Sequence, residues 1–485
     1  MSYSASQLIW NIFYSVRFSL SRKVSIYVAG DKKGKQNLTL LEKNIRSGPN
    51  LSHQGRGDIQ IARKTAHVIN VCPLTEVAPS IDELLNSKPN YKGMRPLGAA
   101  GCFALLPLLL RSRNKLCRLV SGALEGAGAQ PTVLPLLAPE ESWRRSGRLE
   151  DAGEELMKVG DRQGRCYILS PTHEELMTEL IAELSPISPK QLPLLLYQIG
   201  PKFRDEMRPR HGIIRSREFL MKDLYTFHKD EECARRTYHL IGEVYQKIFQ
   251  EIGVEYIKVE ADTGVMGGSL SHEYHYPAAI GEDRLRQCTS CAHQTSSLLH
   301  DEGVGHTFLL GTRYSQPLGA HLVSKKPLHM GCYGLGLSRI LAASLEALCS
   351  PTQLRWPPAL APYSLCIIGP KEGSKEFEVA SPLVERVYSL LQESCPRLKE
   401  DILVDDRTHM TIGKRVMEAK RMGYPHILVV GQKALADPPQ FELLDTEGDY
   451  VQLLELDALL RTRGLQELGR QAPPHCNGSM ENIAQ

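Results

Sequence analysis

The stretch FRDEMRPRHGIIRSREFLMKDLYTFH, from Phe203 to His228, places a basic loop between two runs of residues that favour β-strands. Residues 208–212 of this loop carry too much charge and too many turn-forming residues to pack in an apolar core. We therefore predict a strand, a loop and a returning strand. Five arginines could hold a polyphosphate there: Arg204, Arg208, Arg210, Arg215 and Arg217. Taken alone, such a loop would more often be a solvated, salt-bridged hairpin.

Two other stretches support the phosphate-binding interpretation. A strand expected at residues 166–169 leads into SPTHEE, where Thr172 and Glu175 also fit a helix N-cap and its capping box. Downstream, MGCYGLGLSRILAASLEAL predicts a strand, a glycine turn and a helix with one apolar face. The turn is similar to a dinucleotide fingerprint, but its last position is Arg339 instead of glycine.

These three stretches, in this order, resemble the amino-acid loop, motif 2 and motif 3 of class II aminoacyl-tRNA synthetases. The details PTHEE, RPR and MKD resemble the prolyl-tRNA synthetases, in their mitochondrial form. The resemblance implies an α/β protein: an α+β catalytic domain on an antiparallel sheet, followed by a C-terminal α/β anticodon-binding domain. It also implies ATP-dependent attachment of proline to tRNA(Pro) through a prolyl-adenylate.

The resemblance assigns site residues to both substrates. It implies a proline site made of Thr172, Glu174, Arg204, His272 and Cys332. It implies an ATP site made of Arg204, Glu206, Arg215, Phe219 and Arg339, with Mg²⁺ accompanying ATP and with Arg204 and Arg339 as catalytic residues. The chemistry agrees, because guanidinium forks match phosphate oxygens and a secondary ammonium in an enclosed site needs a carboxylate. His272 next to Glu273 is also compatible with a merely structural pair.

The segment before this core resembles motif 1. A helix is expected after Pro107, glycines 126 and 128 stop it, and residues 132–137 favour a strand. Pro135 matches the proline of the motif, which implies a homodimer. Helix, glycine and strand occur in many folds, so this pattern alone is a weak signal.

The C-terminal part follows a proline-rich linker at residues 351–362. Strands and helices then alternate, which indicates a parallel or mixed sheet. The expected ranges are strands at 364–368, 402–404 and 426–430 and helices at 377–391 and 412–422. The pattern resembles the class IIa anticodon-binding domain, and the resemblance implies tRNA contacts at Arg407, Lys414 and Arg415. A solvated basic helix face, including Lys420 and Arg421, is the alternative.

The first thirty residues contain three basic residues, seven serines and no acidic residue. This composition is typical of a mitochondrial transit peptide, and the alternative is a disordered tail. We expect a transit peptide and disordered leader at 1–60, the catalytic domain at 61–350, the anticodon-binding domain at 363–463 and a disordered tail at 464–485. The expected location is the mitochondrial matrix. No apolar run is long enough to span a membrane.

Two features set limits on function. Cys288 and Cys291 form a CxxC that makes a weak zinc candidate, since no second CxxC lies nearby. The chain has no room between motifs 2 and 3 for the large editing insertion of bacterial prolyl enzymes, so we expect it not to clear alanyl-tRNA itself. A net charge of +3 permits a nucleic-acid partner without requiring one.

Two rival functions remain open from the sequence. The first is a catalytically inactive, synthetase-like accessory protein that binds nucleic acid. The retained arginines at 204, 215 and 339 argue against it. The second is a synthetase for threonine or histidine, and the proline-type details named above argue against that.

Overall fold

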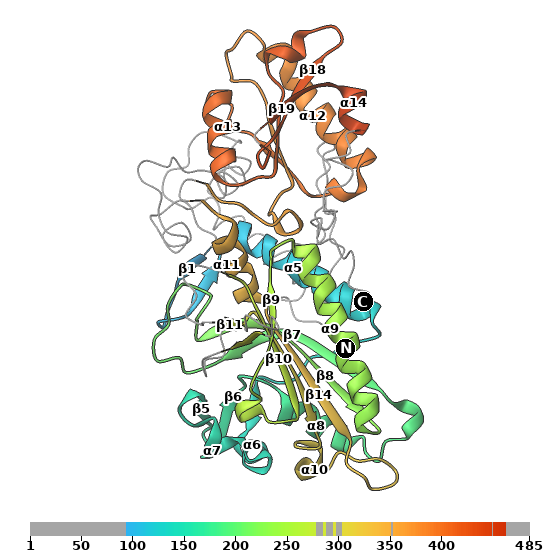
Figure 1. Cartoon of the computed structure of the whole chain (residues 1–485). Helices are drawn as coiled ribbons and strands as arrows, with labels where there is room; N and C mark the ends of the chain where they lie inside the picture. The colour runs from blue at the N-terminus through green and yellow to red at the C-terminus, as the bar shows by residue number, and fades with distance from the viewer. Residues whose placement is uncertain are drawn as a thin grey trace, which may run out of the picture. The chain divides into compact units, whose positions relative to one another are not determined.

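The computed structural model describes residues 94–277, 285–287, 294–296, 303–350, 353–448 and 450–461 (Figure 1). The expected transit peptide, the C-terminal tail and the CxxC cysteines lie outside these residues. The described part contains a nine-stranded sheet, a five-stranded sheet, a three-stranded sheet and a two-stranded hairpin. Within it, no helix is both long and apolar enough to cross a membrane.

The nine-stranded sheet is the scaffold of the catalytic part. Its order is β11-β12-β9-β10-β13-β14-β8-β7-β3. The six strands from β9 to β7 pair antiparallel with one another, whereas β12 pairs parallel with β9 and β3 pairs parallel with β7. The strands are β3 (Gln130–Pro131), β7 (Leu194–Phe203), β8 (Glu218–His228), β9 (Ile257–Glu260), β10 (Leu270–His275), β11 (Leu285–Gln287), β12 (Gln294–Ser296), β13 (Gly305–Gly311) and β14 (His329–Gly336). The predicted strand, loop and returning strand are confirmed as β7 and β8, which pair from Leu194 to Phe203.

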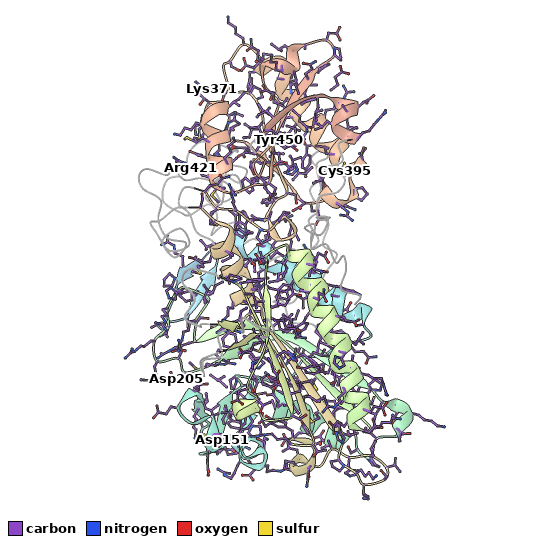
Figure 2. The ribbon with its side chains drawn as sticks, in the orientation of Figure 1. Asp151, Asp205, Lys371, Cys395, Arg421 and Tyr450 are labelled. Carbon is purple, nitrogen blue, oxygen red and sulfur yellow. The ribbon has the colours of Figure 1, made fainter. Side chains whose placement is uncertain are left out.

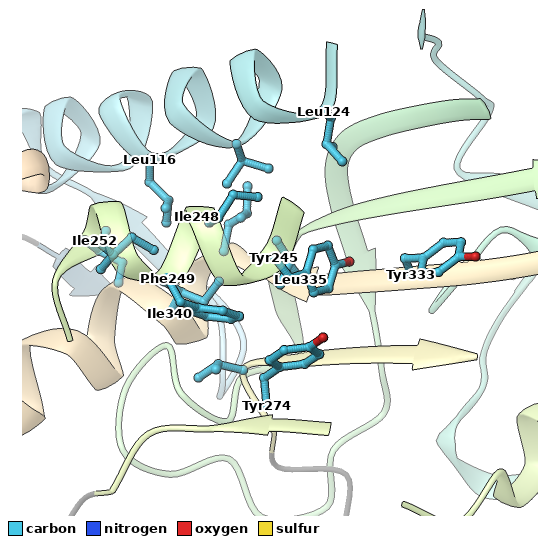
Figure 3. Close-up of a cluster of buried hydrophobic side chains, with 14 of the residues drawn as sticks. Leu116, Leu124, Tyr245, Ile248, Phe249, Ile252, Tyr274, Tyr333, Leu335 and Ile340 are labelled. Atoms are coloured by element: carbon cyan, nitrogen blue, oxygen red, sulfur yellow. The ribbon is translucent and has the colours of Figure 1, made fainter. Parts of the chain in front are cut away.

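Three amphipathic helices cover one face of this sheet, called here the back face. They are α5 (Pro107–Gly126), α9 (Glu231–Ile252) and α11 (Leu337–Leu348). Their apolar stripes form a core with aromatic side chains of the strands (Figure 3). Asp230 caps α9 by accepting a hydrogen bond from the Cys233 amide, and Gly253 ends it with a left-handed φ of 80°. The helices expected after Pro107 and in motif 3 are confirmed as α5 and α11.

The opposite, front face carries smaller elements. They are α8 (Glu174–Glu183), α10 (Ser315–Leu318), and a three-stranded sheet of β4 (Leu137–Pro139), β6 (Cys166–Leu169) and β5 (Met157–Gly160). Two short helices, α6 (Glu140–Ser146) and α7 (Arg148–Asp151), lie between β4 and β5 in sequence, and β1 (Met94–Pro96) pairs with β2 (Phe103–Leu105) as a separate hairpin. A second apolar cluster packs α8 and α10 against the sheet, and a separate small cluster joins the three-stranded sheet to α6.

Three local expectations are wrong. Residues 132–137 do not form one strand, because the Leu134 amide donates to the Gln198 side chain and so leaves the ladder after β3. The expected glycine turn at 334–336 is instead the end of β14, where Gly334 and Gly336 pair with β8. Thr172 is not a helix cap: α8 begins at Glu174 after His173, which makes no capping hydrogen bond with its side chain.

The C-terminal domain has a five-stranded sheet in the order β16-β15-β17-β18-β19. Its elements are β15 (Leu365–Ile368), α12 (Phe377–Ser394), β16 (Ile402–Asp405), α13 (Ile412–Arg421), β17 (His426–Val429), β18 (Gln440–Asp445), β19 (Tyr450–Glu455) and α14 (Leu456–Arg461). The alternating strands and helices are confirmed, and β15, β16 and β17 are parallel. The antiparallel hairpin of β18 and β19 was not predicted. The expected linker contains a short 3₁₀ turn, Pro358–Leu360, whose Leu360 is buried.

Candidate active site

Cross-strand pairing decides which side chains share the front face of the large sheet. Directly paired residues of antiparallel strands point to the same side. One such row runs from Tyr225 through Cys332 and Phe308 to Ser271. The next row contains Asp223, Gly334, His306 and Glu273, which therefore share that face. Gly334 and Gly336, at the end of β14, carry no side chain, so a substrate could approach the backbone of this strand closely.

The motif 2 hairpin supplies a cation over an aromatic ring. The Arg204 guanidinium carbon lies 5.4 Å from the centre of the Phe219 ring. Arg204 follows β7, next to Asp205, which is labelled at the start of the basic loop in Figure 2. Both Arg204 and Phe219 are partly buried, so their outer surfaces remain accessible. An accessible ring can stack on a planar base and an accessible guanidinium can bind a phosphate.

Glu206 and Arg215 form an ion pair across the loop. The Arg215 Nε donates to the Glu206 carboxylate at 2.8 Å, and the Arg208 amide donates to the same carboxylate at 3.0 Å. Burial raises the pKa of Glu206, but these two donors outweigh burial and lower the pKa below its usual range. Glu206 is therefore an ionised acceptor. The loop reverses through His211 and Gly212, which have φ values of 54° and 60°.

Arg339 connects motif 3 to the motif 2 loop. Its Nε donates to the Ile214 carbonyl at 3.0 Å and its NH1 to the Gly303 carbonyl at 2.9 Å. The neighbouring Ser338 hydroxyl accepts from the Leu220 amide at 2.9 Å. The start of α11 is thus fixed to the second half of the loop and to the start of β8. This places the Arg339 guanidinium beside the loop that carries Arg215.

The loop before α8 contains the most buried charges of the site. Glu174 is fully buried, and its Oε2 accepts from Arg148 at 3.0 Å while its Oε1 accepts from the Cys332 thiol at 3.1 Å. Both terminal nitrogens of Arg148 lie 3.2 Å from the Thr172 hydroxyl. Burial and the Glu174 carboxylate hold the pKa of Cys332 well above its usual range, so it stays a thiol. Thr172, Glu174 and Cys332, three residues expected at the proline site, therefore meet in one place.

Arg148 also binds a second carboxylate. Glu175 accepts from its NH1 at 3.2 Å and from the Ser146 hydroxyl at 2.8 Å. The guanidinium lies 4.5 Å from the Trp143 ring centre and 5.8 Å from that of Tyr314. Burial lowers the pKa of Arg148, but Glu175 and Glu174 outweigh burial and raise it above its ordinary value. Arg148 is thus a permanent buried cation.

A second buried network of polar side chains holds the loop before α8 in place. The Lys202 ammonium lies 2.9 Å from the Asp223 carboxylate and 2.5 Å from Nδ1 of His173. Nε2 of His173 lies 3.0 Å from the Pro135 carbonyl, and Gln198 donates to Asp223 at 2.9 Å. Burial, followed by the Lys202 charge, lowers the pKa of His173 to about 4. A neutral imidazole that donates through Nε2 and accepts through Nδ1 satisfies both contacts.

The structure separates one expected residue from the others. His272 belongs to the row of Thr307 and Tyr333, which faces the back of the sheet, and its Nδ1 lies 2.7 Å from the Tyr238 hydroxyl of α9. Burial lowers the pKa of His272 to about 4. Its neighbours Ser271 and Glu273 occupy the front face instead. The structure therefore does not bring His272 together with Cys332.

Three important residues escaped the sequence analysis. Lys202 and Asp223 sit at inward positions of β7 and β8, and a charged residue in an otherwise apolar strand was the available signal. Arg148 gave no comparable signal, because WRRSGR is an ordinary basic stretch until the fold brings it to Thr172.

The expected tRNA contacts divide into buried and exposed residues. Arg415 is fully buried and donates to the carbonyls of Asp405 and Gly369. Arg407 is 4% exposed and is bound by the carboxylates of Asp405 and Glu418. The structure thus places both arginines inside the domain instead of on a basic face. Lys414 is exposed on α13, whose last residue, Arg421, is labelled in Figure 2.

Metal-binding side chains do not cluster in the described part of the chain. Within it, no group of three or more His, Cys, Asp or Glu residues could hold an ion.

Comparison with known proteins agrees with this geometry. Residues 157–348 match the family model of the class II tRNA synthetase core domain (G, H, P, S and T), and residues 366–461 match the model of the anticodon binding domain. The fold and the arginine-lined site thus define a class II aminoacyl-tRNA synthetase.

Relatives narrow the class further. The chain is 44% identical to a probable mitochondrial proline–tRNA ligase of Rattus norvegicus, over 71% of this chain and 77% of that protein. It is 37% identical to the probable mitochondrial enzyme of Schizosaccharomyces pombe, over 69% and 82%. The chain belongs to the proline–tRNA ligase family, of the mitochondrial type.

Solved structures share the fold at lower identity. The prolyl-tRNA synthetase of Giardia lamblia in complex with prolyl-adenylate superimposes with a TM-score of 0.64 at 19% identity, covering 75% of this chain and 72% of that one. The enzyme of Cryptosporidium parvum gives a TM-score of 0.65 at 17% identity, covering 78% and 73%. These likenesses support the two-domain class II fold.

Proposed function

We propose that the chain activates proline with ATP and transfers the prolyl group to tRNA(Pro). The observation that carries this proposal is the meeting of Thr172, Glu174 and Cys332 on the front face of the sheet that also bears the Arg204–Phe219 pair. An amino-acid site and a nucleotide site on one continuous surface are what adenylate formation requires. The family to which the chain belongs supports the same activity.

In the first step, a proline carboxylate oxygen attacks the α-phosphorus of ATP and pyrophosphate leaves. No side-chain nucleophile is needed, so positioning and charge neutralisation do the work. Arg204 bridges the carboxylate and the α-phosphate, while Arg215 and Arg339 hold the outer phosphates. These residues converge because Arg339 is fixed to the carbonyl beside Arg215. ATP enters as its Mg²⁺ complex.

The nucleotide base lies on the Phe219 ring, on which Arg204 already rests. Glu206 accepts a hydrogen bond from the adenine amino group, a role that its lowered pKa favours. Arg215 itself donates to Glu206 at 2.8 Å. ATP therefore competes with an internal ion pair for Arg215.

The proline ammonium is held by the Glu174 carboxylate and the Thr172 hydroxyl, with Cys332 beside them. In the second step, the terminal ribose hydroxyl of tRNA attacks the prolyl carbonyl carbon and AMP leaves with the phosphate oxygen. His272 lies on the back face and reaches Tyr238, so we assign it to support β10 instead of contacting proline.

Three finer assignments complete the proposal. The chain acts in the mitochondrial matrix, which the composition of residues 1–30 supports. It acts as a homodimer through the motif 1 segment, where Val133 and Leu137 are 88% and 45% exposed. It binds tRNA(Pro) through the exposed side of α13, on which Lys414 lies.

The test is aminoacylation of mitochondrial tRNA(Pro) with labelled proline by the full chain. The expected result is charging that the Arg339→Ala variant loses by about 1,000-fold, since removing a cation aimed at transition-state charge has effects of this order. A folded chain that binds the tRNA without charging it would favour the accessory-protein alternative.

A further inference from the structure

The buried cluster of Arg148, Glu174 and Glu175 has an uneven charge. One guanidinium lies against two carboxylates, at 3.0 Å from Glu174 and 3.2 Å from Glu175. All three side chains are at least 95% buried. Within the described residues, Arg148 is the one cation that forms an ion pair with either carboxylate. With both acids ionised, the cluster carries a net charge of minus one.

The geometry divides the two carboxylates into different tasks. Glu174 lies beside Thr172 and Cys332, at the amino-acid site. Glu175 points the other way, where it is 1% exposed and accepts from the Ser146 hydroxyl. Glu175 therefore does not reach the substrate, yet it shares the same Arg148 nitrogen with Glu174.

Arg148 cannot move away to serve either acid alone. Its guanidinium is held against the rings of Trp143 and Tyr314, at 4.5 and 5.8 Å from their centres. It also contacts the Met266 sulfur at 3.3 Å. A fixed cation shared between two acids neutralises each of them only in part.

We propose that Glu175 and Arg148 are positioning residues that keep the amino-acid site at a net charge of minus one, so that the site prefers a substrate with an ammonium group. The proposal rests on the proposed function, since it explains how that site recognises the proline nitrogen. A buried charge without a partner is costly, and a bound ammonium would complete the cluster.

The test is the Glu175→Gln variant of the full chain, studied by calorimetric binding of two probes. One probe is L-proline, and the other is tetrahydrofuran-2-carboxylate, whose ring oxygen replaces the ammonium group. With glutamine at 175, Arg148 neutralises Glu174 alone. Proline should then bind about 10-fold more weakly or worse, as expected for loss of one nearby buried charge. The oxygen analogue keeps the carboxylate but lacks the ammonium group, so the loss of a negative charge at 175 should not weaken its binding.

Two further variants separate charge from packing. Glu175→Asp keeps the charge and should keep most of the preference for proline. The double variant Arg148→Met with Glu175→Gln removes one cation and one acid, and so restores the net charge of minus one. It should prefer proline over the oxygen analogue, since Glu174 is then the one charge of the cluster and an ammonium group is the partner that completes it.

Glu418→Gln is the matched control. Glu418 is equally buried and bound to an arginine, Arg407, but it lies in the C-terminal domain. Its substitution should leave the ratio of the two affinities unchanged.

An unchanged ratio in folded Glu175→Gln would overturn the inference, and so would loss of the preference in the double variant. Neither result would bear on the proposed function, which wild-type aminoacylation tests separately.

Discussion

The described residues contain two buried arginine–carboxylate clusters that differ in their charge balance. In the catalytic domain, Arg148 lies between Glu174 and Glu175. In the C-terminal domain, Arg407 is paired with the carboxylates of Asp405 and Glu418, and a second buried cation, Arg415, lies beside them and donates to the Asp405 carbonyl. The second cluster is complete by itself and the first is one cation short. The difference indicates that the balanced cluster serves the fold, whereas the unbalanced one is completed by a ligand.

The largest effect is expected at the acid that contacts the substrate. Glu174→Gln keeps the shape of the side chain but removes its charge. The cluster then has one cation, Arg148, and one anion, Glu175, so it needs no ammonium group to balance it. Proline activation should fall by about 100-fold or more, since losing a buried charge partner costs roughly 3–5 kcal/mol. The measurement is kcat/KM for proline in pyrophosphate exchange. A fall below threefold would remove Glu174 from the amino-acid site.

The opposite outcome is expected in the balanced cluster. Glu418→Gln leaves two arginines with one carboxylate, so the C-terminal domain should lose about 3 kcal/mol of unfolding free energy. Proline activation should stay within about twofold of wild type, because no substrate completes this cluster. Urea unfolding and pyrophosphate exchange on the same preparation measure both. If Glu418→Gln instead weakened proline activation without changing the unfolding free energy, the C-terminal cluster would not serve the fold alone.

The catalytic cluster recognises an ammonium group, which alanine carries as well as proline. This contact should therefore not distinguish the two amino acids. Proline and alanine then differ only through contacts of the ring, which are worth about 1–3 kcal/mol. Alanine should be activated with a kcat/KM about 10- to 200-fold below that of proline. The measurement is alanine-dependent exchange. Rapid deacylation of alanyl-tRNA by the purified chain would contradict the expectation that it cannot clear this product.

Acid should weaken the catalytic domain more than the C-terminal domain. Burial lowers the pKa of both His173 and His228 to about 4, below the value of about 6.5 in an unfolded chain. The unfolded state therefore binds more protons between these values, and stability falls as the pH drops from about 6.5 towards 4. Each histidine contributes up to about 1.4 kcal/mol per pH unit. Urea unfolding from pH 7.5 to 4.5 measures this slope, and stability that rises on acidification would contradict it.

The smallest effect is expected on the exposed side of α13. Lys414→Ala removes one surface charge near Arg407 in sequence but leaves the buried cluster intact. The KM for tRNA should rise about two- to fivefold and become less salt-dependent, as for loss of one phosphate contact. Pyrophosphate exchange without tRNA should not change. An unchanged salt dependence of charging would place the tRNA elsewhere.

The sequence predicted what depends on local pattern. Arg204, Phe219 and Arg339 were implied by the resemblance of motifs 2 and 3, and the structure places the first two together as a cation over a ring. The helix α13 agrees with its expected range, 412–422, within one residue. Period-two alternation separates His272 from Ser271 and Glu273, but it does not say which side of β10 faces the substrate.

Long-range partners could not be predicted in the same way. Arg148 reaches Thr172 only after β5 and β6 fold back, and Lys202 reaches His173 only after β7 enters the sheet. Arg415 carries the same charge as its exposed neighbour Lys414, and burial alone separates their roles. The charged residues of the sequence were therefore candidates for binding a substrate. The fold then decides which of them are paired with another charge inside the protein.

The most direct test of the account is exchange of labelled pyrophosphate into ATP by the folded wild-type chain, with proline, alanine, threonine and histidine compared at equal concentration. The account predicts strong exchange with proline, weak exchange with alanine and background exchange with the other two. Absence of exchange with all four, from folded protein supplied with Mg²⁺, would contradict an amino-acid-activating site at Glu174 and Arg204.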